Sequence, residues 1–427
     1  MTSIDERPIA ILSAPGSRGD VNPMVAIGSE LRRRGFAVVI SLAENYAAIA
    51  EEAGLIAEPL ISRTEFNALV DNPSMWRPVQ GMRIILRDAS CKFLEPHLNV
   101  IKKHHRPGRT VLVAHPLDFA SRIHRDIDPL TPMVNVLLSP AAVRNPSDPP
   151  RLTSSRLLVR KPASLVKGVY WLADILVADP LLAPTINRVR RSHSLPPVSR
   201  ILDRWWLSPD LVLGMYPRWF GDNSPPCQGP WLNCGFPLAT QCKLAPALGA
   251  DQEHNRKGFP VFATPGTAHH HAKAFFNNVV EASASIGMNC ILATTYPNQL
   301  PNRLPSHVST MAYAALDEVL PQCAAIVHHG GIGTTAIASA TACPQLICPM
   351  AYDQFHNADR IEALGLGMTC RANPWNQGRS AVQALARQLQ FLVGDQATRD
   401  ECVRRSGERA DFCGSEVAAN AISNLLA

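Results

Sequence analysis

The stretch "HHGGIGTTAIASATACPQLICPMAYDQFHNADRI", residues 328–361, is the least random part of this chain. Two histidines precede a glycine-rich turn, and an apolar run then leads to Asp353, Gln354 and Asn357. The turn stands between a predicted strand and a helix that begins near Thr334. Glycine lets the backbone approach a ligand closely, and a helix N-terminus offers unbonded N–H groups to an anion. The turn therefore favours a diphosphate, although a tight strand-to-helix turn without a ligand is an equal alternative.

The pair Asp353 and Gln354 comes just after the next predicted strand, so it lies on the same rim as the glycine-rich turn. Asp353 alone is explained as the N-cap of a helix that ends at Gly365, but this leaves Gln354 and Asn357 without a role. A carboxylate beside an amide is suited to bind vicinal hydroxyls. Diphosphate donors followed by hydroxyl-binding groups predict a nucleotide-sugar site.

Length and composition indicate a soluble protein of several domains. The 427 residues predict roughly two or three domains. A hydrophobic share of 46% suits large cores, and a net charge of +6 is too mild to indicate nucleic acid binding. The N-terminus carries acids and only a short apolar run, which argues against a signal peptide. Aspartates and prolines break the longer apolar stretches, so no membrane span is expected.

Cysteine usage and two short motifs bear on metals and on location. The eleven cysteines are scattered without a C-x-x-C pair, which predicts reduced thiols in a cytoplasmic protein and no zinc site. "RDID" at 125–128 contains D-x-D, but it precedes a strand at the end opposite the expected ligand crevice, so a solvated turn is favoured. "HHH" at 269–271 is expected to face solvent or phosphate. No metal is therefore expected.

Apolar strands alternate with helices in two halves, which predicts parallel β-α-β units. The first half begins with a strand at 8–14, the loop "PGSRGDVN", and a helix at 23–34 with Asn22 as its N-cap. The fold class is therefore α/β, with two doubly wound Rossmann-like domains that face each other across a crevice. Such domains bind ligands at the carboxyl ends of their strands, where both "PGSRGD" and "HHGG" lie.

Domain boundaries follow from the linker, which is placed at 233–257. Residues 1–235 are predicted to form the first domain, residues 236–400 the second, and residues 401–427 terminal helices that pack back toward the first. The section at 151–206 looks helical and departs from the β-α-β rhythm. Its start is basic and contains no acid among Arg151, Arg156, Arg160, Lys161 and Lys167.

The stretch at 313–367 resembles the donor-site signature of family 1 glycosyltransferases with the GT-B fold. That signature joins a ring residue, a short helix, the H-x-G-x-G turn and a D-Q-x-x-N segment. The first loop is similar to the S-x-G-D-x-x-P loop with which bacterial members begin. Within the family, "NPSMW", "INRVRR", "WLSPDLVLGMYPRWF" and "GFPL" are similar to the rhamnosyltransferases of rhamnolipid synthesis.

The resemblance implies a role for each matching position. Tyr313 stacks on the donor base, and Asp353 with Gln354 binds the sugar hydroxyls. The diphosphate contacts are assigned to Thr267, His329, Gly331, Gly333 and Thr334. One position departs from the pattern: many members carry a ribose-binding glutamate where this chain has Ile337.

The catalytic base is assigned to Asp20, which matches the aspartate of the family's first loop. A sugar transferase needs a base for the acceptor hydroxyl and dipoles for the departing diphosphate. Without the resemblance, Asp20 is more simply a capping aspartate. His115 and Asp118 follow another strand of the same half and are expected to support Asp20 or contact the acceptor, with a solvated loop position as the alternative.

The implied function is an inverting, metal-independent glycosyltransferase. It would move a hexose, such as rhamnose, from a nucleotide diphosphate sugar to a lipid-like or other hydrophobic acceptor. The basic start and apolar continuation of 151–178 favour peripheral contact with the inner face of the membrane. An ordinary amphipathic helix packed on the core is the alternative. A nucleotide-sugar epimerase or hydrolase and a non-catalytic nucleotide-sugar-binding protein are the competing functions.

Overall fold

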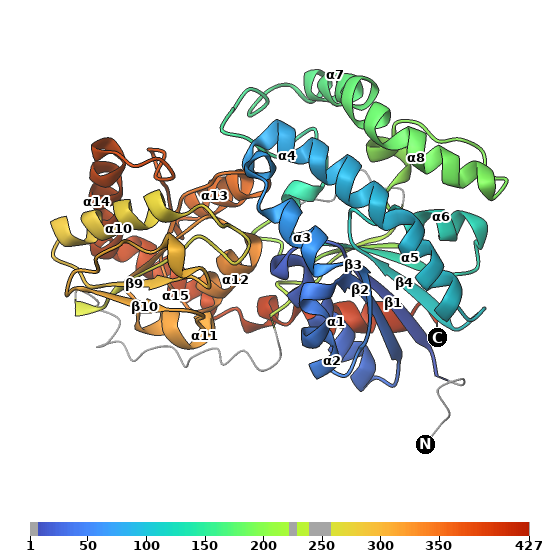
Figure 1. Ribbon diagram of the computed structural model, residues 1–427, viewed down its shortest axis with the longest axis horizontal. Helices are drawn as coiled ribbons and strands as arrows, with labels where there is room; N and C mark the ends of the chain where they lie inside the picture. The colour runs from blue at the N-terminus through green and yellow to red at the C-terminus, as the bar shows by residue number, and fades with distance from the viewer. Residues whose placement is uncertain (1–6, 222–228, 239–257, 427) are drawn as a thin grey trace. The chain divides into compact units, whose positions relative to one another are not determined.

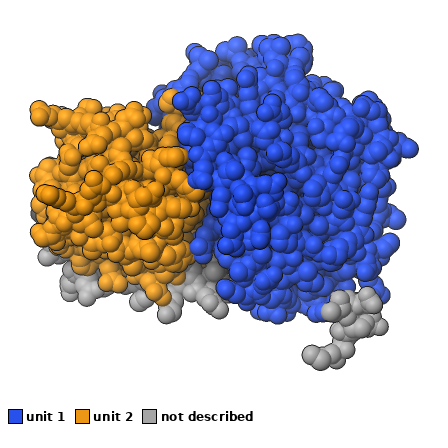
Figure 2. Space-filling model, in the orientation of Figure 1, with its two compact units in different colours: residues 1–151, 155–239, 413–427 blue, residues 152–154, 240–412 orange. Residues whose placement is uncertain are grey.

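The computed structural model describes residues 7–221, 229–238 and 258–426 (Figure 1). These residues form two parallel sheets, one in each of two compact units (Figure 2). Unit 1 comprises residues 1–151, 155–239 and 413–427, and unit 2 comprises residues 152–154 and 240–412. The predicted fold class, two α/β domains with parallel sheets, is confirmed. Most of the predicted linker at 233–257 lies outside the described residues.

The sheet of unit 1 has the strand order β3-β2-β1-β4-β5-β6-β7, and every pair is parallel. Its strands are β1 (Ile9–Ala14), β2 (Ala37–Ala43), β3 (Ile56–Ile61), β4 (Thr110–Ala114), β5 (Met133–Leu137), β6 (Leu211–Gly214) and β7 (Trp231–Asn233). Every residue of β1, β2, β4 and β5 is buried. These strands read as continuous apolar runs because helices cover both faces of the sheet.

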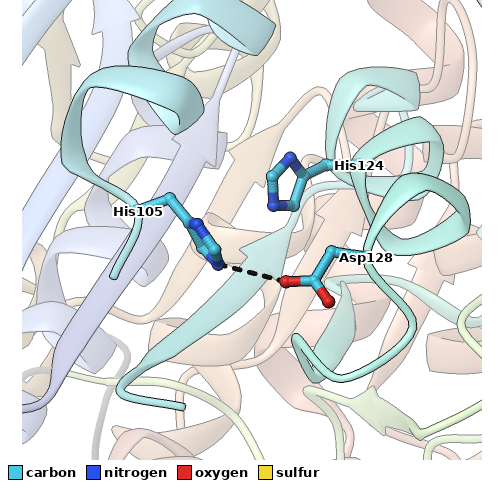
Figure 3. A group of neighbouring side chains, drawn as sticks. All are labelled: His105, His124 and Asp128. Atoms are coloured by element: carbon cyan, nitrogen blue, oxygen red, sulfur yellow. Dashed lines mark ion pairs between the residues drawn. The ribbon is translucent and has the colours of Figure 1, made fainter. Parts of the chain in front are cut away.

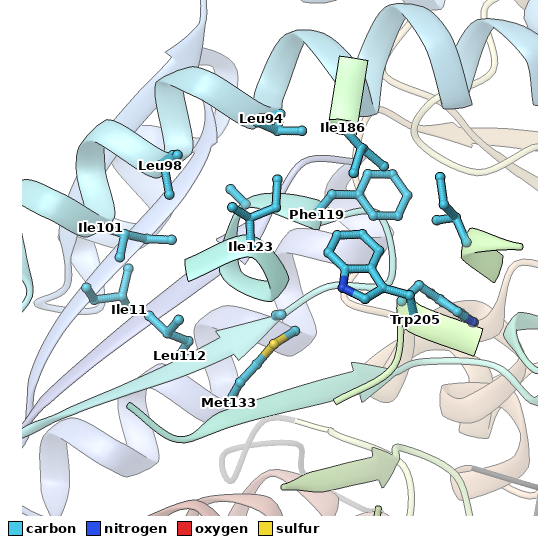
Figure 4. Packing of buried hydrophobic residues seen from close by; sticks show 14 of the residues in the cluster. Ile11, Leu94, Leu98, Ile101, Leu112, Phe119, Ile123, Met133, Ile186 and Trp205 are labelled. Carbon is cyan, nitrogen blue, oxygen red and sulfur yellow. The ribbon is translucent and has the colours of Figure 1, made fainter. Parts of the chain in front are cut away.

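The α-helices of unit 1 precede, connect and follow its strands. They are α1 (Arg18–Arg33), α2 (Ala47–Glu52), α3 (Arg63–Val70), α4 (Pro78–Ile84), α5 (Cys91–His104), α6 (Phe119–Ile127), α7 (Ala163–Ala173), α8 (Asp179–Ser192) and α16 (Gly414–Ser423). On one face, α5, α6, α8 and the π-helical turn η7 (Ile201–Trp205) enclose a core around Leu98, Ile123 and Ile186 (Figure 4). On the other face, α1 contacts β1 and β2, and α16 packs on α1.

The sheet of unit 2 has the order β10-β9-β8-β11-β12-β13 and is also parallel throughout. Its strands are β8 (Val261–Thr264), β9 (Cys290–Ala293), β10 (Val308–Met311), β11 (Ala325–His328), β12 (Gln345–Ile347) and β13 (Gly367–Thr369). Its helices are α10 (Lys273–Ser285), α11 (Leu316–Val319), α12 (Ile332–Ala340), α13 (Gln354–Ala363), α14 (Arg379–Gly394) and α15 (Gln396–Ser406).

The terminal segment divides between the units. Helix α15 packs on α12 within unit 2, whereas α16 belongs to unit 1. The Arg34 guanidinium of unit 1 donates to the Asn420 Oδ1 of α16 at 2.6 Å, which fixes the last helix beside the end of α1.

Candidate functional site

The glycine-rich turn of unit 2, residues 329–331, joins β11 to α12. His328 anchors its start, because the Gly330 N–H donates to His328 Nδ1 at 3.2 Å. The proton of this imidazole therefore lies on Nε2, which is 3.1 Å from Gln345 Oε1. Burial, with a smaller effect of His329, lowers the pKa of His328 to about 3. His328 is thus a neutral, fully buried support for the turn and not a ligand-binding group.

Each glycine of the segment 330–333 has a different steric role. Gly330 has a φ of +90°, and a Cβ there would stand 2.6 Å from Ile347 Cγ2, so both backbone and packing require glycine. A Cβ on Gly331 would come within 2.3 Å of His329 Nε2. A Cβ on Gly333 would meet nothing within 4 Å, so the protein itself does not require glycine at that position.

His329 lies between two glycine loops. Its ring passes close to Gly331 on one side and to Gly266 on the other, where a Cβ would approach the ring to 2.5 Å. Burial lowers the pKa of His329 to about 4, so the imidazole is neutral near pH 7. Its Nδ1 is buried and has no hydrogen-bond partner among the described residues. The ring is therefore held in place by packing, with hydrogen-bonding capacity left over for a ligand.

The helix α12 begins at this turn without a side-chain cap. Its N-cap is Gly331, and the first intrahelical bond runs from the Thr335 N–H to the Gly331 carbonyl at 3.0 Å. The preceding amides lack intrahelical partners and carry the positive end of the helix dipole. Thr334 is half-buried in this first turn. The local arrangement suits an anion such as a diphosphate.

Asn357 ties the glycine-rich turn to Asp353. Its Nδ2 donates to the Gly330 carbonyl and to Asp353 Oδ2, both at 2.9 Å. Asp353 precedes α13 and makes no side-chain cap bond, which argues against a purely capping role. Tyr352, immediately before it, has a left-handed φ of +57°, a strained conformation for a side chain of this size. The carboxylate is therefore positioned by the fold at the edge of the turn.

Gln354 has a structural role that the sequence did not indicate. Its Oε1 accepts hydrogen bonds from the backbone N–H groups of Met350 at 2.9 Å and Ala351 at 3.1 Å. The side-chain carbonyl thus stabilises the loop after β12. Only the amide NH₂ group of Gln354 is left to take part in recognition of a sugar hydroxyl.

The remaining donor-side candidates lie on the same edge of the unit 2 sheet. Thr267 follows β8, Tyr313 follows β10, His329 follows β11 and Asp353 follows β12, so all stand beyond the carboxyl ends of parallel strands. Thr267 is exposed, and the side chain of Tyr313 is open to solvent over more than half of its surface, at 56%. An exposed aromatic ring at that position is able to stack on a base.

The histidines at 269–271 differ in burial: His271 is exposed and His270 is half-buried. His269 is buried, not solvent-facing, and its ring meets the Trp375 ring edge-on at 5.0 Å. Burial, aided by His329 and the neighbouring histidines, lowers the pKa of His269 to about 3. His270 instead packs its ring against Tyr296, with the ring centroids 4.1 Å apart.

Asp20 in unit 1 lies in the first turn of α1, which begins earlier than predicted. The helix starts at Arg18 with Ser17 as N-cap, so Asn22 and Pro23 lie inside it. The early start results from a capping box, in which Ser17 Oγ accepts from the Gly19 N–H and the Ser17 N–H donates to Asp20 Oδ2 at 2.8 Å. Asp20 therefore caps the helix, and 30% of its side chain remains exposed.

The second oxygen of Asp20 is paired with His115. The Leu117 N–H donates to His115 Nδ1 at 3.2 Å, so the imidazole proton lies on Nε2 and points to Asp20 Oδ1, also at 3.2 Å. The His115 backbone N–H donates to Ser13 Oγ at 3.0 Å, which joins the loop after β4 to the end of β1. The structure thus brings these two predicted residues together as a carboxylate–imidazole pair.

Asp118 lies apart from that pair and is buried. It is the N-cap of α6 and accepts from the Ser121 N–H at 3.0 Å and the Ser121 hydroxyl at 2.6 Å. Burial alone would raise the pKa of Asp118, but the nearby His97, at 3.1 Å, and Ser121 outweigh it and lower the pKa to about 2. These contacts give Asp118 a role in stabilising the start of α6.

The D-x-D motif is divided between two environments, and Asp126 does not lie in a solvated turn. Asp126 accepts from the Trp205 Nε1–H at 2.8 Å and pairs with Arg122 and Arg190. Asp128 accepts from the Thr131 hydroxyl at 2.6 Å on the other side of the helix end. Because their side chains bind different partners, the two aspartates do not form one diphosphate-metal site.

Comparisons with known proteins agree with this layout. The model of the EryCIII-like C-terminal domain, named after erythromycin biosynthesis protein CIII, matches residues 277–423. The chain is 37% identical to the aclacinomycin-T 2-deoxy-L-fucose transferase of Streptomyces galilaeus over 114 residues, which span only 26% of that relative and 25% of this chain. It is 26% identical to the L-demethylnoviosyl transferase of Streptomyces niveus over 365 residues, or 84% of each chain.

Solved structures share the fold over the whole length. The glycotransferase of kitacinnamycin gives a TM-score of 0.70 at 20% identity, covering 99% of this chain and 100% of its own. The spinosyn rhamnosyltransferase SpnG, solved with thymidine diphosphate, gives 0.64 at 18% identity, covering 98% and 99%. The matches do not single out rhamnolipid synthesis. The chain shares the GT-B fold of these glycosyltransferases, and its residues 277–423 match the EryCIII-like C-terminal domain.

Proposed function

We propose that this protein is an inverting, metal-independent transferase that moves a hexose from a nucleotide diphosphate sugar to a hydroxyl of a hydrophobic acceptor. The observation that carries the proposal is the division of chemistry between the units. Unit 1 holds a carboxylate–imidazole pair at the carboxyl ends of β1 and β4, and unit 2 holds an uncapped helix N-terminus beside a neutral histidine.

In the proposed reaction, Asp20, His115 and the first amides of α12 each have a separate role. Asp20 takes the proton of the acceptor hydroxyl as its oxygen bonds to the anomeric carbon. The bond from that carbon to the diphosphate breaks on the opposite face, and the amides of the first turn of α12 stabilise the departing charge. His115 donates to Asp20 and holds the carboxylate in one orientation. Because the amide donors and Thr334 meet the diphosphate, this scheme needs no cation.

A thymidine diphosphate sugar is the donor that the site favours. In the resemblance, the position of the ribose-binding glutamate is Ile337, a partly buried residue packed against the core around Phe262 and Leu320. Isoleucine accepts no hydrogen bond, and the deoxyribose of thymidine diphosphate lacks the 2′-hydroxyl that a glutamate would bind. SpnG, a structural neighbour, binds thymidine diphosphate. Rhamnose is one hexose consistent with this donor class.

The acceptor is proposed to be lipid-like, because unit 1 presents a large apolar helix surface. The helix Ala163–Ser192 is long and apolar enough to cross a membrane by length and composition, and only 22% of its most apolar window is buried. We define its outward face as Leu165, Trp171, Leu172, Ile175 and Leu176, all exposed. The solved neighbour SpnG has been captured with a large aglycone, the spinosyn aglycone.

Charge near that face supports a peripheral location at the inner, anionic face of the membrane. Arg156, Arg160, Lys161 and Lys167 are exposed at or just before the start of the helix. Apolar residues next to exposed cations suit an interfacial position better than a membrane-spanning one. The nine described cysteines are free thiols, which supports a cytoplasmic setting.

The test is an assay of nucleoside diphosphate release with a panel of thymidine and uridine diphosphate sugars. Each donor is combined with lipid alcohols, with polyketide-like aglycones or with free sugars. We expect release to require both a thymidine diphosphate sugar and a hydrophobic alcohol, and to persist after exhaustive chelation. Consumption of hydrophilic acceptors alone would overturn the acceptor assignment. Activity that vanishes with EDTA and returns with magnesium would overturn the metal-independent scheme.

A further inference from the structure

A cluster of two histidines and a carboxylate lies in unit 1 outside the groups used above. His124 and Asp128 stand four residues apart at the end of α6, and His105 comes from the end of α5 (Figure 3). Residues at this spacing lie one above the other on a helix, so their side chains point the same way. One ligand atom from each of the three lies within 4.8 Å of the other two.

One buried ring nitrogen of the cluster, His124 Nε2, makes no hydrogen bond within the described residues. The Thr131 hydroxyl donates to Asp128 Oδ2 at 2.6 Å and lies 2.8 Å from His105 Nε2. His124 is 6% exposed, and its Nε2 is buried with no hydrogen-bond partner in the described part of the chain. A buried polar atom without a partner costs stability unless water or an ion satisfies it.

The spacing of the three side chains matches a known type of metal site. Two ligands about 2.0–2.1 Å from a tetrahedral zinc ion stand roughly 3.3 Å apart. His105 Nε2 and Asp128 Oδ2 are 3.4 Å apart, and the rings of His105 and His124 meet edge to face with centroids 4.8 Å apart. We propose that His105, His124 and Asp128 bind one zinc ion, with water as the fourth ligand.

The charges nearby set the expected strength of this site. Asp128 is its one carboxylate, and Lys102 lies near enough to add positive charge. This neighbouring cation weakens the attraction of the site for a divalent ion. We therefore expect binding in the micromolar range instead of the far tighter binding of sites with several thiolates.

The site is separate from sugar transfer. His105 precedes β4 and Asp128 precedes β5, so the cluster lies at the amino ends of these strands, whereas Asp20 and His115 follow the carboxyl ends of β1 and β4. A zinc ion here would join the ends of α5 and α6 and stabilise unit 1. A metal ion at that end of the sheet lies away from the Asp20–His115 pair, so initial transfer rates should not depend on it.

The test is calorimetric titration of the metal-free full-length protein with zinc, together with thermal unfolding. The variants are His124→Ala and Asp128→Asn, the latter of which keeps an acceptor for the Thr131 hydroxyl. His193→Ala is the matched control, because it removes a neighbour and no ligand. We expect about one zinc ion per chain, a raised Tm, at least tenfold weaker binding in both variants and retained binding in the control.

Cobalt provides a second readout, since four-coordinate cobalt gives visible bands that a nonspecific surface ion does not. We expect these bands in the wild type and their loss in both variants. Two results would overturn the proposal: no zinc binding by the folded wild type, or unchanged binding in both variants, which would point to other histidines such as those at 269–271.

Discussion

Two helices that each follow a parallel strand begin in opposite ways. Helix α1 starts with a capping box, in which Ser17 and Asp20 satisfy the first backbone amides. Helix α12 starts at Gly331 with no side-chain cap. Where side chains of the protein cap the first amides of a helix, as in α1, a carboxylate stands at the helix start. Where these amides have no side-chain partner, as in α12, they attract the anion of a ligand. We therefore propose that the same strand–loop–helix element supplies a base in one unit and an anion-binding site in the other.

His115 in unit 1 and His329 in unit 2 also differ in whether their ring nitrogens are bonded within the protein. His115 is fixed by bonds to both ring nitrogens, from the Leu117 N–H and to Asp20. His329 is fixed by the two glycines that flank its ring, and its Nδ1 is left without a partner among the described residues. A histidine that orients a neighbouring side chain, such as His115, uses its hydrogen bonds within the protein. A histidine that binds a ligand, such as His329, keeps a ring nitrogen available for a hydrogen bond to that ligand.

The largest expected effect is a loss of turnover when Asp20, in the first turn of α1, is replaced. Asp20→Asn should reduce kcat by ~10²–10⁴-fold, because the amide cannot take the acceptor proton. Single-turnover rates at saturating donor and acceptor would measure this. Ser17→Ala is the matched control: it removes the capping hydroxyl at a cost of about 1 kcal/mol in stability but leaves the carboxylate in place. Near-normal turnover by Asp20→Asn would move the base elsewhere.

The next largest effect is on ligand affinity, and it distinguishes the roles of Gly331 and Gly333 in unit 2. Gly333→Ala should weaken nucleoside diphosphate binding at least tenfold with no change in Tm. A Cβ there meets no atom of the described residues within 4 Å, and in the proposed donor site it would stand in the space of the diphosphate. Gly331→Ala should lower both affinity and Tm, because its Cβ overlaps the His329 ring. Calorimetry and thermal unfolding distinguish the two. Unchanged affinity in Gly333→Ala would show that no ligand approaches that face.

A smaller effect is expected at the carboxylate beside the anion-binding site. Asp353→Ala should weaken binding of the intact sugar donor by about 1–3 kcal/mol, since a hydroxyl of the sugar loses its partner. Binding of thymidine diphosphate alone should change much less. Asn357→Ala serves as comparison, because it frees the Gly330 carbonyl and should weaken both ligands. Equal losses for sugar donor and bare diphosphate in Asp353→Ala would make Asp353 structural.

The smallest effect is a difference in acid sensitivity. Burial keeps the pKa of His328 at about 3 and that of His329 at about 4. Unfolded histidine titrates near 6.5, so between these values the unfolded state binds more protons and stability falls as the pH decreases from about 6.5 toward 4. Asp118 has a pKa of about 2, so its contribution is lost only below about pH 4. The Tm of His328→Asn should therefore depend less on pH between 7 and 5 than that of the wild type.

Sequence reasoning predicted the parallel strands and the rim on which the donor residues gather, because buried parallel strands and glycine turns are local signals. It did not predict the role of Gln354, whose carbonyl binds the loop after β12. Support of Asp20 by His115, which is 95 positions away, was predicted only as one of several alternatives. It also began α1 at Pro23, since a proline at the first position is a strong signal, while the Ser17–Asp20 box was read only as a loop. Contacts between distant loops depend on how strands order in the sheet, which no local pattern contains.

The most direct test of the division between the units is the thymidine diphosphate affinity of Asp20→Asn, measured by calorimetry on the same preparation whose turnover is assayed. If the base lies in unit 1 and the anion-binding site in unit 2, the Kd should stay within about twofold of the wild type while transfer is lost. A Kd that weakens in step with the loss of transfer would contradict the account, because it would place Asp20 in donor binding or in the folding of the donor site.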